Sequence, residues 1–374
     1  MKIYLEQNVY DAAMDRIRWL FSEFKNVIVN CSGGKDSTIV VHLALQVAEE
    51  LGRLPVKVLF IDQEAEWQCT IDAVRQIMDD PRVEPRWLQV PIRLFNATST
   101  YAPWLWCWRV GDPWIRDKEP DSIKENTYGA DRFAKMFAAF GVAEFNNDSY
   151  CIIAGVRAEE SPGRLVGLTA YETYKGVTWG RVYNKKRCQY GFYPIYDWSY
   201  TDVWKAIHDN GWPYCRLYDY LYQYGTAPRN MRVSNVHHET AIKSLFFMQE
   251  IEPDTWDKIA ARLSGISSAG QLRKDWLQIG ELPFMFNTWA EYRNHLLENL
   301  ITDEAIKETL RRQFTSYDKA YDESAQHDLM RTQISMILNN DYHGTKLSTF
   351  RAAHGQQSKN RGKRDRYRST APAN

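Results

Sequence analysis

The sequence predicts an α/β fold with a doubly wound, mainly parallel sheet and an appended α-helical C-terminal region. Over the N-terminal half, short apolar runs rich in β-branched residues alternate with amphipathic helical patterns, which is typical of parallel sheets built from strand–helix–strand units. From about Asn235 the helical patterns continue without strand candidates, and from Arg351 the chain becomes basic and poor in apolar residues. We therefore expect an α/β domain over residues 1–230, a helical region over 231–345 and a disordered basic tail over 346–374.

The first strand and the helix after it frame a glycine-rich turn. Asn8 can cap a helix ahead of them, VIVNC (Val27 to Cys31) resembles a buried strand, and Thr38 to Leu51 has apolar residues at helical spacing. Between strand and helix lies SGGKDS, Ser32 to Ser37. Two glycines let the backbone turn sharply, the helix start offers free N–H groups to an anion, and Lys35 adds a positive charge. An ordinary turn is the alternative, but it does not require this combination, so the pattern favours a phosphate-binding loop.

Two later strands end in charged residues. The run VKVLFID ends at Asp62, and Glu66 follows it. The run SYCIIAG leads into a segment that contains Arg157, Glu160 and Arg164. Ligands of open parallel sheets bind outside the carboxyl ends of the strands, so we expect these side chains at the same crevice as the glycine-rich turn. The carboxylates of the second segment can bind magnesium or order a basic group. A solvated charge cluster at a helix start is the alternative that the sequence leaves open.

Tryptophan is concentrated in the stretch from Ser99 to Arg116, which holds Trp104, Trp106, Trp108 and Trp114. A spacing of two would place the first three on one face of an extended segment. They can form an aromatic wall that stacks a base or covers a nucleotide. Packing over the core is the alternative, and we favour it because large aromatic side chains mostly serve packing.

Composition excludes some classes of protein. Basic and acidic residues balance at 47 each, and the mean hydropathy of −0.52 comes without an apolar run long enough for a membrane span. The N-terminus lacks the apolar stretch of a signal peptide, and six cysteines occur without a C-x-x-C pair, which fits reduced thiols in the cytoplasm. From Arg351 to Arg368 there are seven basic residues against one acid. This tail can contact nucleic acid phosphates or can simply aid solubility.

The motifs together resemble one family. SGGKDS is neither the Walker A pattern nor G-x-G-x-x-G, but it is similar to the PP-loop of ATP pyrophosphatases. Asp62 with Glu66, the segment GVRAEES-x-x-R from Gly155 to Arg164, and PIYDWSYTDVWKAI follow in order. This set resembles the phosphoadenosine phosphosulfate (PAPS) reductase and ATP sulfurylase branch over roughly residues 20–215. RNMRVSN and QEIEPDTWDK are similar to IbrA-type proteins, which are often paired with a ParB-like partner and are common in phages and mobile elements.

The resemblance implies an adenine nucleotide α-hydrolase-like fold that binds ATP and Mg²⁺ and cleaves ATP between the α and β phosphates to adenylylate an acceptor. It also implies a ParB-like partner, and it leaves a homo-oligomer open. Carried over by motif, the catalytic residues would be Lys35, Asp36, Arg157 and Glu160, and magnesium would bind Asp36 and Glu66. The nucleotide-binding residues would be Ser32, Gly33, Gly34, Lys35, Asp36, Ser37, Asp62, Gly155 and Arg164.

One departure from the family concerns cysteine. PAPS reductases carry a cysteine in a Glu-Cys-Gly-x-His tail, but here Cys215 is the last cysteine and 159 residues follow it. The clustered cysteines of iron–sulfur members are also absent from the sequence, so we expect no iron–sulfur cluster and no PAPS reduction by that chemistry. The favoured hypothesis is an ATP-cleaving enzyme with an unidentified acceptor. The alternative is a nucleotide-sensing regulatory or defence module that acts through a ParB-like partner or DNA.

Overall fold

The computed structural model describes residues 5–99, 102, 104–169, 172–233, 235–237, 242–266 and 281–354. The chain divides into two compact units, each described here by itself. Unit 1 comprises Met1–Leu94, Trp106–Val236 and Phe247–Arg262, and unit 2 comprises Phe95–Leu105, His237–Phe246 and Leu263–Asn374. The segment Phe247–Arg262, inside the expected helical region, thus groups with the α/β unit. Of the expected disordered tail over 346–374, residues 346–354 are helical instead, because Leu347 and Phe350 join the buried core of unit 2. Residues 355–374 lie outside the described residues.

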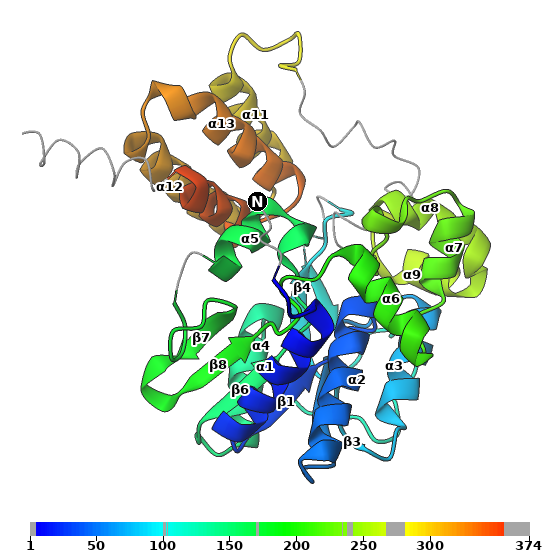
Figure 1. Ribbon diagram of the computed structural model, residues 1–374. Helices are drawn as coiled ribbons and strands as arrows, with labels where there is room; N and C mark the ends of the chain where they lie inside the picture. Colours follow the sequence, from blue (N-terminus) through cyan, green and yellow to red (C-terminus); the bar gives the residue numbers. More distant parts are fainter. Residues whose placement is uncertain are drawn as a thin grey trace, which may run out of the picture. The chain divides into compact units, whose positions relative to one another are not determined.

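Unit 1 is built on a six-stranded sheet with the order β3-β2-β1-β6-β8-β7 (Figure 1). All neighbours pair in parallel except β7 and β8, which are antiparallel. Successive strands move outward from β1 to β3, and the chain then returns to the other side of β1, so the order reverses between β1 and β6. This confirms the predicted doubly wound sheet. The rule for open parallel sheets predicts a ligand site at the carboxyl ends of β1 and β6, where the order reverses. The strands are β1 Val27–Asn30, β2 Val56–Ile61, β3 Val83–Leu88, β6 Tyr150–Ile153, β7 Gly180–Asn184 and β8 Gln189–Phe192.

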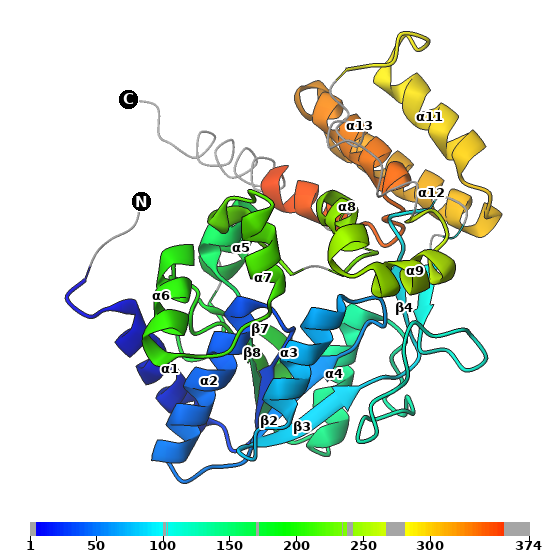
Figure 2. The same ribbon diagram turned by 90° about the vertical axis from the view of Figure 1, so that its right-hand side faces the viewer.

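Helices cover both faces of the sheet. Val27 and Val29 of β1 belong to a buried core shared with α1, α2, α3 and α6, whereas Ile28 faces the opposite side. On that opposite side α4 packs, and the Tyr150 hydroxyl of β6 donates to the carbonyl of Ala138. Figures 1 and 2 show α2 and α3 side by side on one face. The helices are α1 Val9–Glu23, α2 Lys35–Glu50, α3 Gln68–Met78, α4 Phe133–Glu144, α5 Pro162–Thr169, α6 Tyr200–Asn210, α7 Leu217–Gln223 and α9 Pro253–Arg262.

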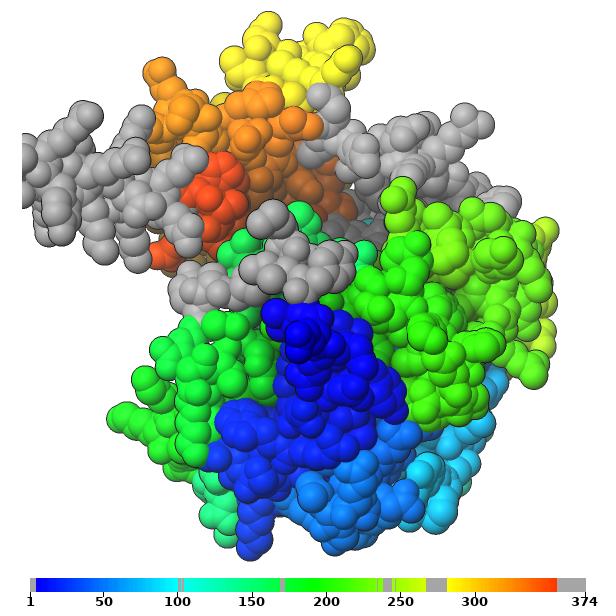
Figure 3. Space-filling view, viewed as in Figure 1, coloured from blue at the N-terminus to red at the C-terminus, as the bar shows by residue number. Residues whose placement is uncertain are grey.

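Local sequence explains several helix ends in unit 1. The Asn8 side chain accepts a hydrogen bond from the Asp11 amide and caps α1, as the sequence predicts. Ser199 and Asp202 form a reciprocal capping box at the start of α6. Figure 3 shows the blue segment with α1 and α2 meeting the green segment with α6 and α7 at the surface.

Unit 2 contains a helical core. Helices α11 (Trp289–Leu300), α12 (Glu304–Ala320) and α13 (Glu323–Leu338) bury a common apolar cluster that includes Leu297, Phe314 and Ile337. The chain passes between the units in α8 (Ile242–Ile251) and in a two-stranded sheet of β4 (Ile92–Phe95) and β5 (Trp104–Cys107). Among the described residues, no helix is both long and apolar enough to cross a membrane.

Candidate functional site

The glycine-rich loop joins β1 to α2 and is held in shape by its own serines. The Ser37 hydroxyl accepts a hydrogen bond from the Ser32 amide at 3.0 Å and donates to the Gly34 carbonyl at 2.9 Å. Gly33 has φ +71°, and a Cβ there would lie 2.6 Å from Thr70 Cγ2, so only glycine fits. Gly34 is the N-cap of α2 and offers no side chain to the helix amides. The N-cap residue therefore supplies no capping side chain, which suits the first turn of α2 to an anion.

Lys35 is buried within this loop. Its ammonium donates to the Met231 carbonyl at 3.1 Å and lies 3.4 Å from the Asp36 carboxylate. Its backbone amide donates to the Tyr218 hydroxyl at 3.0 Å. Burial lowers the pKa of Lys35, and the neighbouring Asp36 carboxylate opposes that shift. Two groups from distant parts of the chain thus occupy donors that a phosphate group would need.

The end of β6 brings the second predicted motif to the loop. Arg157 is 5 % exposed and pairs through Nε with the Asp36 carboxylate. A Cβ at Gly155 would lie 2.5 Å from the backbone carbon and oxygen of Asp36, so this glycine allows the strand end to meet the first turn of α2. The structure therefore brings together Lys35, Asp36, Gly155 and Arg157, four of the residues predicted for the site.

Arg164, the remaining cation of the second motif, lies near a residue that the sequence pattern did not mark. Glu160 pairs with Arg164 through its carboxylate and accepts a hydrogen bond from Arg232 at its carbonyl, 2.9 Å away. Burial lowers the pKa of Arg164, and the positive charges of Arg232 and Arg157 lower it further. The Asp36 carboxylate opposes this shift. Arg232 also opposes protonation of Lys35. The four cations Lys35, Arg157, Arg164 and Arg232 therefore influence one another around the loop.

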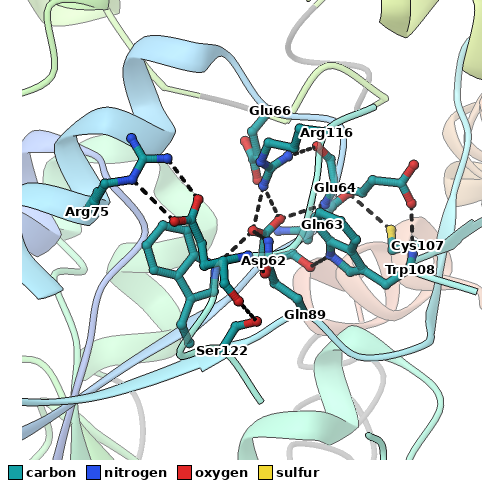
Figure 4. A network of polar contacts seen from close by, with 12 residues as sticks. Asp62, Gln63, Glu64, Glu66, Arg75, Gln89, Cys107, Trp108, Arg116 and Ser122 are labelled. Atoms are coloured by element: carbon teal, nitrogen blue, oxygen red, sulfur yellow. Dashed lines mark hydrogen bonds and ion pairs between the residues drawn. The ribbon is translucent and has the colours of Figure 1, made fainter. Parts of the chain in front are cut away.

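Asp62 lies at the end of β2 in a closed network (Figure 4). It is fully buried, and its carboxylate accepts hydrogen bonds from Trp87 Nε1 at 2.9 Å, Gln89 Nε2 at 3.0 Å and the Glu64 amide at 2.9 Å. Arg116 donates to the same carboxylate at 2.6 Å. Asp62 is thus engaged by protein groups on both oxygens, and a direct contact with a nucleotide stays a prediction.

The tryptophan stretch supports this network rather than forming an exposed wall. Trp108 is fully buried, and its indole donates to the Asp62 carbonyl at 3.0 Å. Its φ of +56° ends the alternation of β5, so Trp104 and Trp106 share a face and Trp108 does not continue it. In unit 2, Trp104 stacks on Phe95 with ring centroids 4.7 Å apart. Trp104 and Trp108 therefore match the packing alternative.

Glu66 follows the end of β2. Unlike Asp62 and Glu64, it forms no ion pair with a basic side chain among the described contacts. It is 5 % exposed, and Asn235 Nδ2 donates to it at 2.7 Å. Burial, with a contribution from the Asp62 carboxylate, raises the pKa of Glu66 to about 8. At neutral pH the group is therefore mostly protonated. A protonated carboxyl group must release its proton before it can bind a cation.

The fit of the loop to magnesium depends on Asp36. In the part of the chain that the structure describes, no three His, Cys, Asp or Glu side chains gather as a metal site. Mg²⁺ on a nucleotide is usually held by phosphate oxygens, waters and one or two carboxylates. The Asp36 carboxylate, beside Lys35 and at the start of α2, suits that role, whereas Glu66 faces Asn235 and does so only when ionised. Magnesium binding by this pair stays a prediction.

Tyr218, Met231 and Arg232 were missed because nothing local marks them. Tyr218 is fully buried, and burial raises the pKa of its hydroxyl. Met231 contributes only a backbone carbonyl. Arg232 lies in the RNMRVSN segment, which resembles IbrA-type proteins without implying a role for any of its residues. A basic residue in a family-typical segment was the one available signal.

Comparisons with known proteins show which family the chain is similar to. Residues 26–97 and 116–224 match the family described as phosphoadenosine phosphosulfate reductase domain, and residues 225–359 match a domain of unknown function (DUF3440). The uncharacterized protein YbdN of Escherichia coli (strain K12) is 32 % identical over 285 residues, which cover 72 % of this chain and 68 % of YbdN. The adenosine 5'-phosphosulfate reductase of Lysinibacillus sphaericus is 22 % identical over 66 % of this chain and 87 % of its own.

Among solved structures, a phosphoadenylyl-sulfate (PAPS) reductase from Candida auris covers 59 % of this chain and 94 % of its own. Its sequence identity is 15 % and its TM-score 0.33. An FMN adenylyltransferase of Candida glabrata, in complex with FMN and an ATP analogue, matches 59 % of this chain at 13 % identity and a TM-score of 0.36.

Proposed function

Because the chain belongs to the PAPS-reductase-like branch of the PP-loop family, we propose that it binds ATP at Ser32–Ser37 and cleaves it between the α and β phosphates to adenylylate an acceptor. The observation that carries this proposal is the cluster of four cations around a serine-braced loop at the start of α2. An ATP molecule carries about four negative charges. Cations and helix amides held in position are the groups that stabilise the transfer of a phosphoryl group.

In this proposal the β and γ phosphates occupy the loop. The Lys35 ammonium gives up its hydrogen bond to the Met231 carbonyl and donates to a phosphate oxygen instead. The Lys35 amide likewise gives up the Tyr218 hydroxyl for a phosphate oxygen. Lys35 and Arg157 then balance the charge that grows on the leaving pyrophosphate. Asp36 orients Arg157 and offers a ligand to the magnesium ion that accompanies ATP. The catalytic contribution of one such group is typically about 3–4 kcal/mol of barrier.

The acceptor would approach from the side of Arg164. A hollow of about 430 Å³ lies there, lined among others by Val156, Arg164, Arg181 and Tyr193. Val156 follows Gly155, which touches the Asp36 backbone, so the hollow begins next to the loop. The lining holds two guanidinium groups against one carboxylate, that of Glu172, and a partly apolar wall, which suits a small anionic acceptor with an apolar portion. Glu160 holds Arg164 and thereby acts as a positioning residue.

A second candidate is a nucleotide sensor. The resting loop donates to Tyr218 and Met231, and Met231 and Arg232 lie in the region that matches the domain of unknown function. Nucleotide binding would displace this segment and report the bound state to a partner. A ParB-like protein, nucleic acid bound through Arg351–Arg368, a homo-oligomer, a phage or mobile-element context and a cytoplasmic location remain proposals that rest on the resemblance and the composition.

The exchange of labelled pyrophosphate into ATP tests the enzymatic proposal. Adenylylation is reversible, so a suitable small carboxylate, sulfate or phosphate acceptor should stimulate the exchange. Lys35→Ala should abolish it, and Arg181→Ala should raise the acceptor concentration needed while ATP affinity stays unchanged. Absence of exchange with every acceptor class, together with ATP-dependent binding of a partner protein, would favour the sensor instead.

A further inference from the structure

Two cysteines that lie far apart in the sequence meet behind the phosphate loop. Cys69 in the first turn of α3 and Cys215 just before α7 place their sulfur atoms 3.9 Å apart. Cys69 is half-buried and Cys215 is 1 % exposed. Neither residue has a role in the proposed reaction. The sequence, with its scattered cysteines, gave no sign of this pair.

The surroundings of the pair favour a reactive thiol. The hydrogen bond with Cys69 lowers the pKa of Cys215, and the Leu217 amide and the Thr70 hydroxyl lower it further. Burial opposes this shift. The same bond, burial and the Glu252 carboxylate raise the pKa of Cys69. These shifts favour the thiolate, which is the reactive form, at Cys215 over Cys69, and the sulfur of Cys69 lies beside it.

Both cysteines connect directly to the loop. Thr70, next to Cys69, has its methyl group where a side chain at Gly33 would have to lie. The Cys215 carbonyl accepts a hydrogen bond from the Tyr218 amide, and the Tyr218 hydroxyl accepts one from the Lys35 amide. A change in the separation of the two sulfurs thus acts on the loop from two sides.

We propose that Cys69 and Cys215 are a thiol modification site, which a peroxide converts to a reversible disulfide that weakens nucleotide binding at Ser32–Ser37. The Cys215 thiolate attacks the peroxide, the O–O bond breaks, and a sulfenic acid and hydroxide form. The Cys69 thiol then displaces the sulfenic oxygen as water. Overall, two thiols and one hydrogen peroxide give one disulfide and two waters, and a reducing dithiol reverses the change.

The cross-link requires a small movement with a defined effect. The sulfurs must approach from 3.9 Å to ~2.05 Å, which draws the start of α7 toward α3. Tyr218 then stays fixed over the Lys35 amide that the nucleotide needs. We expect ATP affinity to fall about tenfold, the equivalent of one hydrogen bond to a charged phosphate.

The test measures the cross-link and its effect separately on the full chain. After mild peroxide treatment, peptide mass mapping should find a Cys69–Cys215 link in the wild type. The control variant Cys188→Ser should also form the link, because Cys188 is a half-buried cysteine in the turn before β8. Cys69→Ser and Cys215→Ser should lack the link. Calorimetry with ATP should show the loss of affinity only in the two proteins that form it, and dithiothreitol should restore it.

Two results would overturn the proposal. One is a folded, peroxide-treated wild type without the link. The other is a complete link with unchanged ATP affinity. If the reduced protein bound no ATP, the proposed function and the effect on affinity would both fail, whereas the mass map would still decide whether the disulfide forms.

Discussion

Asp36 and Arg157 form a largely buried ion pair although 121 positions separate them in the chain. The pair exists because β1 and β6 are adjacent parallel strands whose carboxyl ends open on the same edge of the sheet. It joins the phosphate loop to the GVRAEES segment. The predictions below follow from the contacts around this pair.

Gly155→Ala should prevent the close approach of the two segments. A Cβ at this position would lie 2.5 Å from the Asp36 backbone, and such overpacking typically costs about 1–3 kcal/mol of stability. We expect the urea midpoint to fall and ATP binding to be lost. Gly163→Ala is the matched control, because a Cβ there meets nothing within 4 Å. Equal stability of the two variants would contradict the packing described.

Tyr218→Phe should release the Lys35 amide. The hydroxyl accepts that amide in the resting loop, so its loss should cost about 0.5–1.5 kcal/mol of folding stability while ATP affinity rises. Urea unfolding and calorimetry measure the two effects. A drop in ATP affinity would mean that the hydroxyl assists the nucleotide rather than competing with it.

Glu66→Gln should remove a pH dependence of stability. Burial raises the pKa of Glu66 from its ordinary value of 4.5 to about 8. The folded state therefore holds a proton that the unfolded state releases, and stability falls as pH rises from about 4.5 to about 8. The variant keeps an oxygen for Asn235 and should gain stability over the wild type at pH 8 but not at pH 4.5. Unfolding curves at several pH values measure the stability of the wild type, of Glu66→Gln and of the control Glu308→Gln, which lies on an exposed helix face. Parallel pH profiles of stability for the wild type and Glu66→Gln would refute the prediction.

Arg116→Ala should destabilise unit 1 strongly. Arg116 is the cation that faces the fully buried Asp62 carboxylate, and loss of one partner of a buried ion pair costs about 3–5 kcal/mol. Arg109→Ala is the control, because Arg109 is 55 % exposed and pairs with Asp112 near the surface, where about 0–1 kcal/mol is typical. Urea unfolding measures both variants. A similarly small loss of folding stability in the two would show that Arg116 does not stabilise the Asp62 carboxylate.

Local patterns were sufficient for the fold and for part of the site. The loop, the mainly parallel sheet and the meeting of Gly155 and Arg157 with Asp36 follow from periodicity and the rule that ligands bind at strand ends. The contacts of Tyr218, Arg232 and the Cys69–Cys215 pair do not, because each depends on a long-range approach that no local spacing encodes. Trp108 is buried, as the favoured packing alternative predicts, but its positive φ, which the spacing of two does not indicate, takes it off the shared face.

The identity of the products formed from ATP tests the central claim most directly. ATP labelled at the α phosphate is incubated with the protein, magnesium and candidate acceptors, and the labelled products are separated. The account predicts labelled AMP or an adenylate together with pyrophosphate, lost in Lys35→Ala and Arg157→Ala. Labelled ADP with release of inorganic phosphate would contradict it.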